Sequence, residues 1–194
     1  MDDTLERFLD ELWAAGREHD AELADRSDRL RNVEPETARM LAVLVHATGA
    51  RRVLELGTSN GYSTVWLADA TAGTVLTVEL DAGRAEQAHA TFAQVGLGDT
   101  IELAEADGAQ ILAKSPDREF DFVFLDAERS EYTRWWPDLL RTLNSPGLIV
   151  VDNVLSHAGE VQEFRAVVDA EPAVTSAVVP IGAGTLLITR LPNN

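Results

Sequence analysis

Short apolar runs alternate with helical segments along most of this chain, and this alternation limits the folds open to it more than any other feature. The predicted strands are, in chain order, Arg51 to Leu56, Thr74 to Leu80, Thr100 to Leu103, Phe120 to Leu125 and Leu148 to Val151. The predicted helices that follow them are Tyr62 to Ala70, Ala82 to Val95, Gly108 to Lys114, Glu131 to Leu143 and Gly159 to Asp169. Strands that alternate with helices predict a parallel, doubly wound α/β sheet with helices on both faces.

The C-terminal part of the chain has a different pattern. Two apolar runs, Ala173 to Pro180 and Thr185 to Thr189, are joined by the glycine-containing segment Ile181 to Gly184. This arrangement predicts an antiparallel hairpin at one edge of the sheet. We therefore expect a mostly parallel, seven-stranded sheet that ends in an antiparallel hairpin.

The N-terminal segment shows helical rather than strand periodicity. Apolar residues recur at helical spacing from Leu5 to Leu12, and a densely charged stretch runs from Arg17 to Arg31, which predicts one or two amphipathic helices. The charged stretch fits a solvated helix face, a dimer interface or a substrate lid. A further helix begins at Pro35 and ends near Gly49. We expect one domain over residues 1–194, with a helical cap over 1–48 and a cofactor-binding core over 49–194.

Composition excludes several classes of function. The chain contains no cysteine, so disulfides, thiolate catalysis and cysteine-ligated zinc are ruled out, and any metal must be held by oxygen or imidazole. A formal net charge of -17 would repel phosphate backbones, so we expect no nucleic-acid partner. No apolar run is long enough to span a membrane, and the acidic N-terminus does not resemble a signal peptide. These features predict a cytoplasmic protein without a membrane partner.

A glycine turn follows the first predicted strand. Gly57 and Gly61 lie where a buried strand turns sharply into a helix, which lets a ligand approach the backbone closely. Glu79 ends the next strand, where an acidic side chain can accept both hydroxyls of a ribose. The turn lacks the third glycine of a dinucleotide-binding motif, which counts against a nicotinamide cofactor. The alternative is a tight turn beside a solvated acid.

Acidic residues also follow the later strands. Asp107 ends the third strand and either lies beside an adenine or caps the next helix. Asp126 follows the fourth strand, and Asp152 and Asn153 follow the fifth. In a parallel sheet these groups reach the same edge as the glycine turn, where two carboxylates and an amide oxygen suit a hard ion such as Mg²⁺. Alternatively, the acids cap loops or contact the cofactor without a metal.

Together these segments resemble the metal-dependent O-methyltransferases that include catechol O-methyltransferase and caffeoyl-CoA O-methyltransferase, from about Asn32 to Leu191. The most specific stretches are Leu125 to Tyr132 and Val151-Asp152-Asn153. The resemblance implies a Rossmann-like fold that binds S-adenosylmethionine, a metal held by Asp126, Asp152 and Asn153, and commonly a homodimer. It implies that Ser63 contacts the cofactor carboxylate and that Asn32 and Val33 close over its methionyl end. The cofactor-binding residues expected in this way are Asn32, Val33, Glu55, Gly57, Thr58, Ser59, Gly61, Tyr62, Ser63, Glu79, Asp107, Gly108, Ala109 and Asp126.

One position departs from the family pattern. Arg129 stands where the family commonly has a lysine that removes the phenol proton, and an arginine essentially never gives up its own proton. Arg129 can still stabilise a phenolate or orient an acidic substrate. His157 is the available imidazole near the same edge and is our candidate base, although it fits an ordinary surface histidine as well.

The leading hypothesis is therefore transfer of a methyl group from S-adenosylmethionine to a phenolic or catechol-like small molecule, assisted by Mg²⁺ or another divalent cation. Coordination to a cation lowers the pKa of a phenol and produces the attacking phenolate. The alternatives are metal-independent methylation of a small molecule, a nicotinamide-dependent oxidoreductase, and a cofactor-binding protein without activity. The identity of the methyl acceptor does not follow from the sequence.

Overall fold

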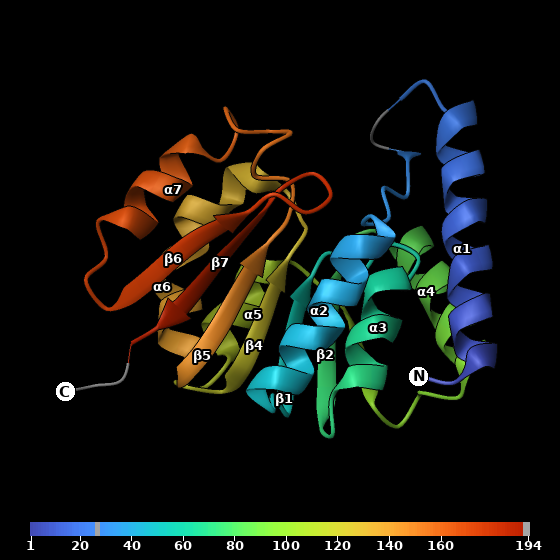
Figure 1. Ribbon diagram of the computed structural model, residues 1–194, viewed down its shortest axis with the longest axis horizontal. Coiled ribbons are helices and arrows are strands. Elements are labelled where there is room, and N and C mark those ends of the chain that lie inside the picture. Colours follow the sequence, from blue (N-terminus) through green and yellow to red (C-terminus); the bar gives the residue numbers. More distant parts are fainter. Residues whose placement is uncertain (26–27, 192–194) are drawn as a thin grey trace.

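A seven-stranded sheet with helices on both faces forms the centre of the molecule (Figure 1). The computed structural model describes residues 1–25 and 28–191; residues 26 and 27, within the charged N-terminal stretch, and 192–194 lie outside the described part. The strands are β1 (Arg52–Leu56), β2 (Thr74–Glu79), β3 (Ile101–Glu105), β4 (Phe120–Leu125), β5 (Leu143–Val151), β6 (Val174–Val179) and β7 (Thr185–Arg190). The helices are α1 (Asp3–Glu22), α2 (Pro35–Thr48), α3 (Tyr62–Ala70), α4 (Ala82–Val95), α5 (Gly108–Lys114), η2 (Arg129–Glu131), α6 (Tyr132–Thr142) and α7 (Gln162–Asp169).

The strand order is β3-β2-β1-β4-β5-β7-β6. Strands β1 to β5 pair in parallel, whereas β7 is antiparallel to both β5 and β6. The parallel order and the C-terminal hairpin predicted from the sequence are confirmed. The order reverses between β1 and β4, and ligands of such sheets bind at the carboxyl ends of the strands on either side of that reversal.

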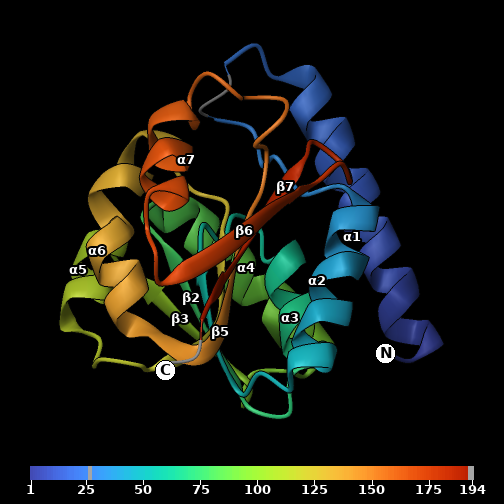
Figure 2. The same ribbon diagram turned by 60° about the vertical axis from the view of Figure 1, so that its left-hand side comes forward.

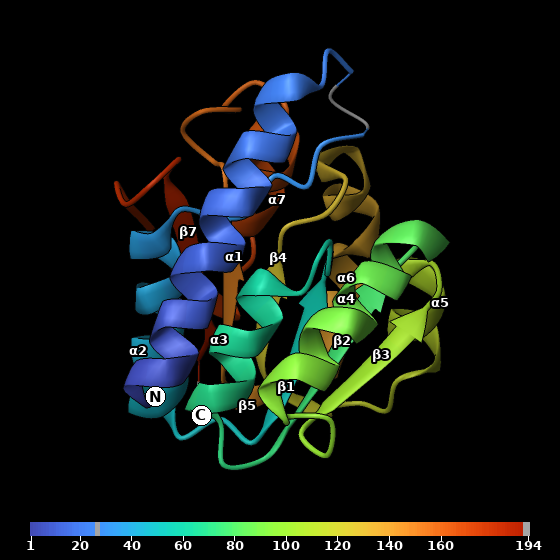
Figure 3. The same cartoon turned by 90° about the vertical axis from the view of Figure 1, so that its right-hand side faces the viewer.

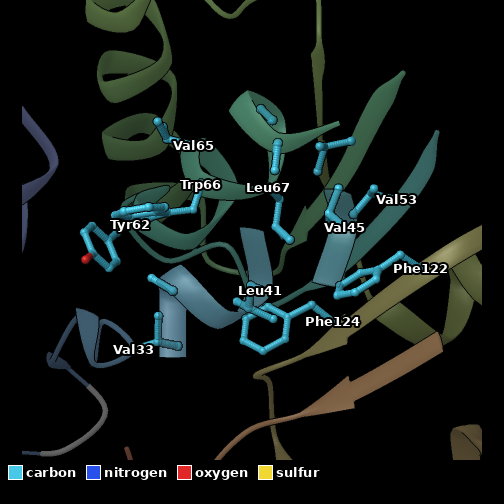
Figure 4. Packing of buried hydrophobic residues seen from close by; sticks show 14 of the residues in the cluster. Val33, Leu41, Val45, Val53, Tyr62, Val65, Trp66, Leu67, Phe122 and Phe124 are labelled. Carbon is cyan, nitrogen blue, oxygen red and sulfur yellow. The ribbon is translucent and has the colours of Figure 1, made fainter. Parts of the chain in front are cut away.

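The helices form two groups, one on each face of the sheet. Figure 2 shows α5, α6 and α7 on one face, with α1, α2 and α3 on the other. Because successive strand residues point to opposite faces, Val53 and Phe122 pack into the α1–α4 side, while Leu54 and Val123 pack into the α5–α7 side. Figure 4 shows the first of these cores, in which Leu41 and other α2 and α3 residues pack against one face of the sheet. Both faces are thus buried, which explains why the central strands are almost continuously apolar.

The N-terminal helices pack on this core. Asp2 caps α1 by accepting hydrogen bonds from the backbone N–H groups of the first turn, and Leu9 of α1 is completely buried. Helix α2 begins with Pro35 at its first turn and ends at Gly49, which adopts the left-handed conformation typical of a helix end. Figure 3 shows α1 running along the outside of α2 and α3. No helix in the described ranges is long and apolar enough to cross a membrane.

In the N-terminal segment, where one or two helices were expected, helix α1 ends at Glu22. Several other predicted boundaries were wrong. Helix α6 ends at Thr142, and β5 already begins at Leu143 rather than at Leu148, because Leu143 pairs with Phe120 of β4. The pairing of β5 with β4 shifts register between Phe120 and Phe122, opposite Pro146 and Gly147 of β5. These two residues interrupt the apolar pattern, so the sequence placed the start of the strand after them. Helix α7 begins at Gln162, three residues later than the predicted Gly159.

Candidate active site

A cavity of about 740 Å³ opens at the carboxyl ends of β1, β2 and β4. It is lined by residues from the glycine turn, from the ends of β2 and β4, and from the segment Leu30 to Val33, which we call the strap. The predicted site residues that line it are Asn32, Val33, Gly57, Thr58, Ser59, Ser63, Glu79, Asp107, Gly108, Asp126, Arg129 and Asn153. The predicted site residues outside its lining are Glu55, Gly61, Tyr62, Ala109, Asp152 and His157.

Gly57 brings the first turn close to the loop after β4. Its φ of 103° lies in the region that favours glycine, and a Cβ atom there would lie 2.2 Å from the carbonyl oxygen of Asp126. The Asp126 N–H donates to the Leu56 carbonyl at 3.0 Å. This tight contact holds the end of β4 beside the glycine turn, so that both contribute to one cavity.

Glu79 is held rigidly at the end of β2. One of its carboxylate oxygens accepts a hydrogen bond from the Ser59 N–H at 2.8 Å, and the other accepts from the N–H groups of Leu80 and Asp81 at 2.9 and 3.0 Å. Each carboxylate oxygen can accept more than one hydrogen bond, so the side chain retains capacity for ligand hydroxyls. The carboxylate therefore both orders the turn and faces the cavity.

Glu55 lies beneath the turn, fully buried in the sheet. Its carboxyl group accepts hydrogen bonds from the hydroxyls of Ser63 and Thr77, each at 2.6 Å, and from Thr64. Burial raises the pKa of Glu55 to about 7, although the three hydroxyls oppose that rise. Glu55 does not line the cavity. It fixes the side chain of Ser63, which does.

Two other predicted binding residues, Gly61 and Tyr62, lie outside the cavity lining. Gly61 begins α3 with a φ of 86°, and its missing side chain leaves room for the Phe92 ring. Tyr62 is 1% exposed and belongs to the core shown in Figure 4. Their roles in holding a cofactor stay predictions.

Asp107 caps α5 and lines the cavity at the same time. Its Oδ1 accepts a hydrogen bond from the Ala109 N–H at 2.8 Å, which is the capping arrangement considered from the sequence. Gly108 faces the indole of Trp135, since a Cβ atom at this position would lie 3.1 Å from the ring. The cavity wall here therefore combines an acid, a small residue and an aromatic face, and Trp135 was not among the predicted site residues.

The strap crosses one side of the cavity and is held there by hydrogen bonds with Asp20, Ser59 and Trp13. The carboxylate of Asp20, from α1, accepts hydrogen bonds from the N–H groups of Leu30 and Arg31 at 2.7 and 2.8 Å. The Leu30 carbonyl accepts from the Ser59 hydroxyl at 2.7 Å, and the Val33 carbonyl accepts from the Trp13 indole at 3.1 Å. These bonds bring the strap to the glycine turn.

Asp126, Asp152 and Asn153 converge where β4 and β5 end. The Asn153 amide nitrogen donates to a carboxylate oxygen of Asp126 at 3.2 Å and to one of Asp152 at 3.1 Å. Asn153 has a φ of 66°, which turns it back toward the cavity. The second oxygen of Asp152, Oδ1, is buried and has no hydrogen-bond partner among the described residues. The sequence prediction that these three side chains lie together agrees with this geometry.

Burial raises the pKa of both carboxyl groups above the ordinary value for aspartate. Burial raises the pKa of Asp126 to about 6, while Arg31 and Arg129 keep it below the value that burial alone would give. Burial, followed by the negative charge of Asp126, raises the pKa of Asp152 to about 7. Two paired acids, an unsatisfied buried oxygen and a nearby amide fit a divalent cation, because oxygen ligands and negative charge are what such an ion requires.

The two residues predicted to act in catalysis are placed differently. Arg129 lines the cavity, and its Nε forms an ion pair with Glu160 at 2.7 Å. His157 is outside the cavity lining, and its Nδ1 lies 2.8 Å from the Ser156 hydroxyl. The role of His157 as a base therefore stays a prediction.

Comparisons with known proteins agree with this geometry. The chain is 33% identical over 133 residues to a catechol O-methyltransferase from Mycobacterium tuberculosis, and 34% identical over 152 residues to one from Niastella koreensis. These matches cover 68% and 75% of this chain, and 60% and 66% of the relatives' own lengths. A solved O-methyltransferase from Streptomyces achromogenes, involved in tomaymycin synthesis and in complex with S-adenosylmethionine, is similar with a TM-score of 0.81 and 26% identity. That likeness covers 98% of this chain and 91% of the other.

The family model for O-methyltransferases matches residues 18–191, which includes the strap, the glycine turn, Asp126, Asp152 and Asn153. The chain belongs to the O-methyltransferase family.

Proposed function

We propose that this protein transfers a methyl group from S-adenosylmethionine to the hydroxyl oxygen of a phenolic or catechol-like small molecule, with the help of a divalent cation. One observation carries the proposal: Asp126, Asp152 and Asn153 converge at the strand ends, immediately beside the glycine turn. A methyl donor and a methyl acceptor can therefore meet within one cavity.

The glycine turn and the residues around it are proposed to hold the methyl donor. Gly57 lets the donor approach the backbone closely, and Glu79 accepts hydrogen bonds from the ribose hydroxyls. Asp107 and Gly108 lie beside the adenine. The complex of the similar Streptomyces enzyme with S-adenosylmethionine supports this cofactor. The strap would then cover the methionyl end and exclude water from the reacting sulfonium.

Asp126, Asp152 and Asn153 are proposed to hold the cation, which we expect to be Mg²⁺. When bound, such an ion lowers the pKa of a coordinated phenol and orients the oxygen. The names of the two catechol O-methyltransferase relatives support a phenolic acceptor. Arg129 remains charged and cannot act as the base, but it lies near enough to Asp126 to stabilise negative charge on the acceptor.

The bond changes balance without another reactant. The acceptor loses its hydroxyl proton to water or to a protein base, its oxygen attacks the methyl carbon in line with the leaving sulfur, and S-adenosylhomocysteine leaves. We propose His157 as that base on the sequence argument alone. If the His157→Ala protein keeps its turnover and pH profile, His157 has no such role.

The experiment is methyl transfer from labelled S-adenosylmethionine to a panel of catechols, with Mg²⁺ or with EDTA. We expect labelled product with Mg²⁺, its loss in EDTA, and its loss in Asp126→Asn protein. An exposed acid away from the cavity, Asp99, supplies the matched control, since Asp99→Asn should leave the rate unchanged.

Turnover that survives EDTA and Asp126→Asn would overturn the role of the metal and leave metal-independent methylation. Binding of NAD in place of S-adenosylhomocysteine would overturn methyl transfer altogether. By resemblance only, we also propose a homodimer, which sedimentation of the purified chain would test.

A further inference from the structure

The cavity is unusually rich in arginine for so acidic a chain. The formal net charge is -17, so the long-range field of the protein repels anions. Nevertheless, the described lining residues include the arginines Arg29, Arg31, Arg84, Arg129 and Arg134. An anion attracted to this cavity must therefore be bound by local positive charge.

Four of these arginines are already engaged. Arg129 pairs with Glu160 at 2.7 Å, and Arg134 pairs with Glu131 at 2.6 Å. The guanidinium groups of Arg29 and Arg84 donate to the backbone carbonyls of Leu23 and Arg29, respectively. For Arg31, by contrast, no hydrogen bond or ion pair joins its guanidinium to any residue in the ranges 1–25 and 28–191.

The backbone of Arg31 is fixed, although its guanidinium has no hydrogen-bond or ion-pair partner within residues 1–25 and 28–191. Its φ of 55° is rarely adopted by residues other than glycine, and its N–H is bound by the Asp20 carboxylate at 2.8 Å. The side chain lines the cavity, close enough for its charge to act on Asp126. The strap thus places the guanidinium of Arg31 beside Asp126, one of the acids proposed to hold the cation.

We propose that Arg31 binds a carboxylate on the methyl acceptor, so that the preferred substrates are phenols that carry a carboxylate group. The inference rests on the proposed function and names the substrate class for the same cavity. The planar guanidinium forms two parallel hydrogen bonds with a carboxylate.

The methyl donor also carries a carboxylate, at its methionyl end, and that group can bind an arginine in the same way. The test therefore measures binding of acceptor and donor separately. It uses full-length protein saturated with S-adenosylhomocysteine and Mg²⁺, titrated calorimetrically with 2,3- and 3,4-dihydroxybenzoate and with their methyl esters. The ester keeps both phenolic hydroxyls and the ring but removes the charge.

We expect at least one acid to bind with an affinity about tenfold higher than that of its ester. This is the size of effect expected for a hydrogen bond between charged groups. Arg31→Gln should abolish this preference by weakening the acid alone, and Arg31→Lys should retain part of it. Arg7, exposed on α1 and outside the cavity lining, provides the control, since Arg7→Gln should retain the full preference.

Equal binding of acids and esters to the wild-type protein, or no binding of either, would overturn the proposal. So would an Arg31→Gln protein that keeps the acid preference but binds S-adenosylhomocysteine about tenfold more weakly, because Arg31 would then hold the donor carboxylate. Methyl transfer to the same compounds is scored separately. An acid that binds through Arg31 but is never methylated would refute the proposed function and leave the binding inference standing.

Discussion

Glu55 is predicted to make the protein less stable as the pH rises. Its folded-state pKa of about 7 lies above the ordinary value of 4.5, so the folded protein keeps a proton that the unfolded chain releases. The stability associated with that proton is fully present below about pH 4.5 and is lost as the pH rises through about 7. The full difference corresponds to about 3 kcal/mol.

The perturbation is Glu55→Gln, which keeps the shape of the protonated side chain but cannot ionise. The glutamine carbonyl can still accept hydrogen bonds from the surrounding hydroxyls. The Thr77 hydroxyl lies 2.6 Å from the Thr58 hydroxyl and can reorient to accept a hydrogen bond from the glutamine N–H. We expect little difference in unfolding free energy from the wild type at pH 5. By pH 8 the variant should have gained about 2 to 3 kcal/mol relative to the wild type.

Urea unfolding at pH 5 and pH 8 measures this change. Comparison of the two proteins cancels the part of the pH dependence that does not involve Glu55, whereas the repulsion between Glu55 and Asp126 is part of the expected difference. The matched control is Glu102→Gln, because Glu102 is exposed on the edge strand β3. If Glu55→Gln is more strongly destabilised relative to the wild type at pH 8 than at pH 5, the raised pKa of Glu55 is wrong. The three hydroxyls would then stabilise an ionised Glu55 more than burial disfavours it.

Three further changes test how the cavity is built. Gly57→Ala should destabilise the fold by about 3 kcal/mol and abolish binding of S-adenosylhomocysteine, because its Cβ would collide with the backbone of Asp126; thermal unfolding and calorimetry check this. Tyr132→Phe should cost about 1 to 2 kcal/mol in urea unfolding, since the phenol hydroxyl bonds both the N–H and the carbonyl of Ala127; an unchanged midpoint would contradict this. Asp20→Ala should release the strap and weaken S-adenosylhomocysteine binding about fivefold, and unchanged affinity would show that the strap does not contact the cofactor.

The fold was largely predictable because its signals are local. The central strands are apolar on both faces, and the helices between them have clear ends, so α3, α4 and α5 begin and end where the sequence predicted. The start of β5 was missed because Pro146 and Gly147 interrupt its pattern, and only pairing with Phe120 extends the strand back to Leu143.

The site was predictable where it follows from topology. Strand ends of a parallel sheet share one edge, so the meeting of Asp126, Asp152 and Asn153 could be expected. The position of Arg31 in the cavity lining could not be expected, because it depends on how the strap returns across the cavity. A charged N-terminal stretch carries no local signal for that path. The engagement of Glu55 by buried hydroxyls likewise depends on contacts between β1, β2 and α3.

We propose that the three side chains at the ends of β4 and β5 hold the cation that supports methyl transfer. Mn²⁺ titration followed by electron paramagnetic resonance, with S-adenosylhomocysteine and a catechol present, measures this binding. We expect one bound Mn²⁺ per chain in the wild-type protein, displaced by Mg²⁺, and none in Asp152→Asn protein of intact fold. Absence of bound Mn²⁺ in the wild type, or undiminished binding in Asp152→Asn protein, would contradict this proposal.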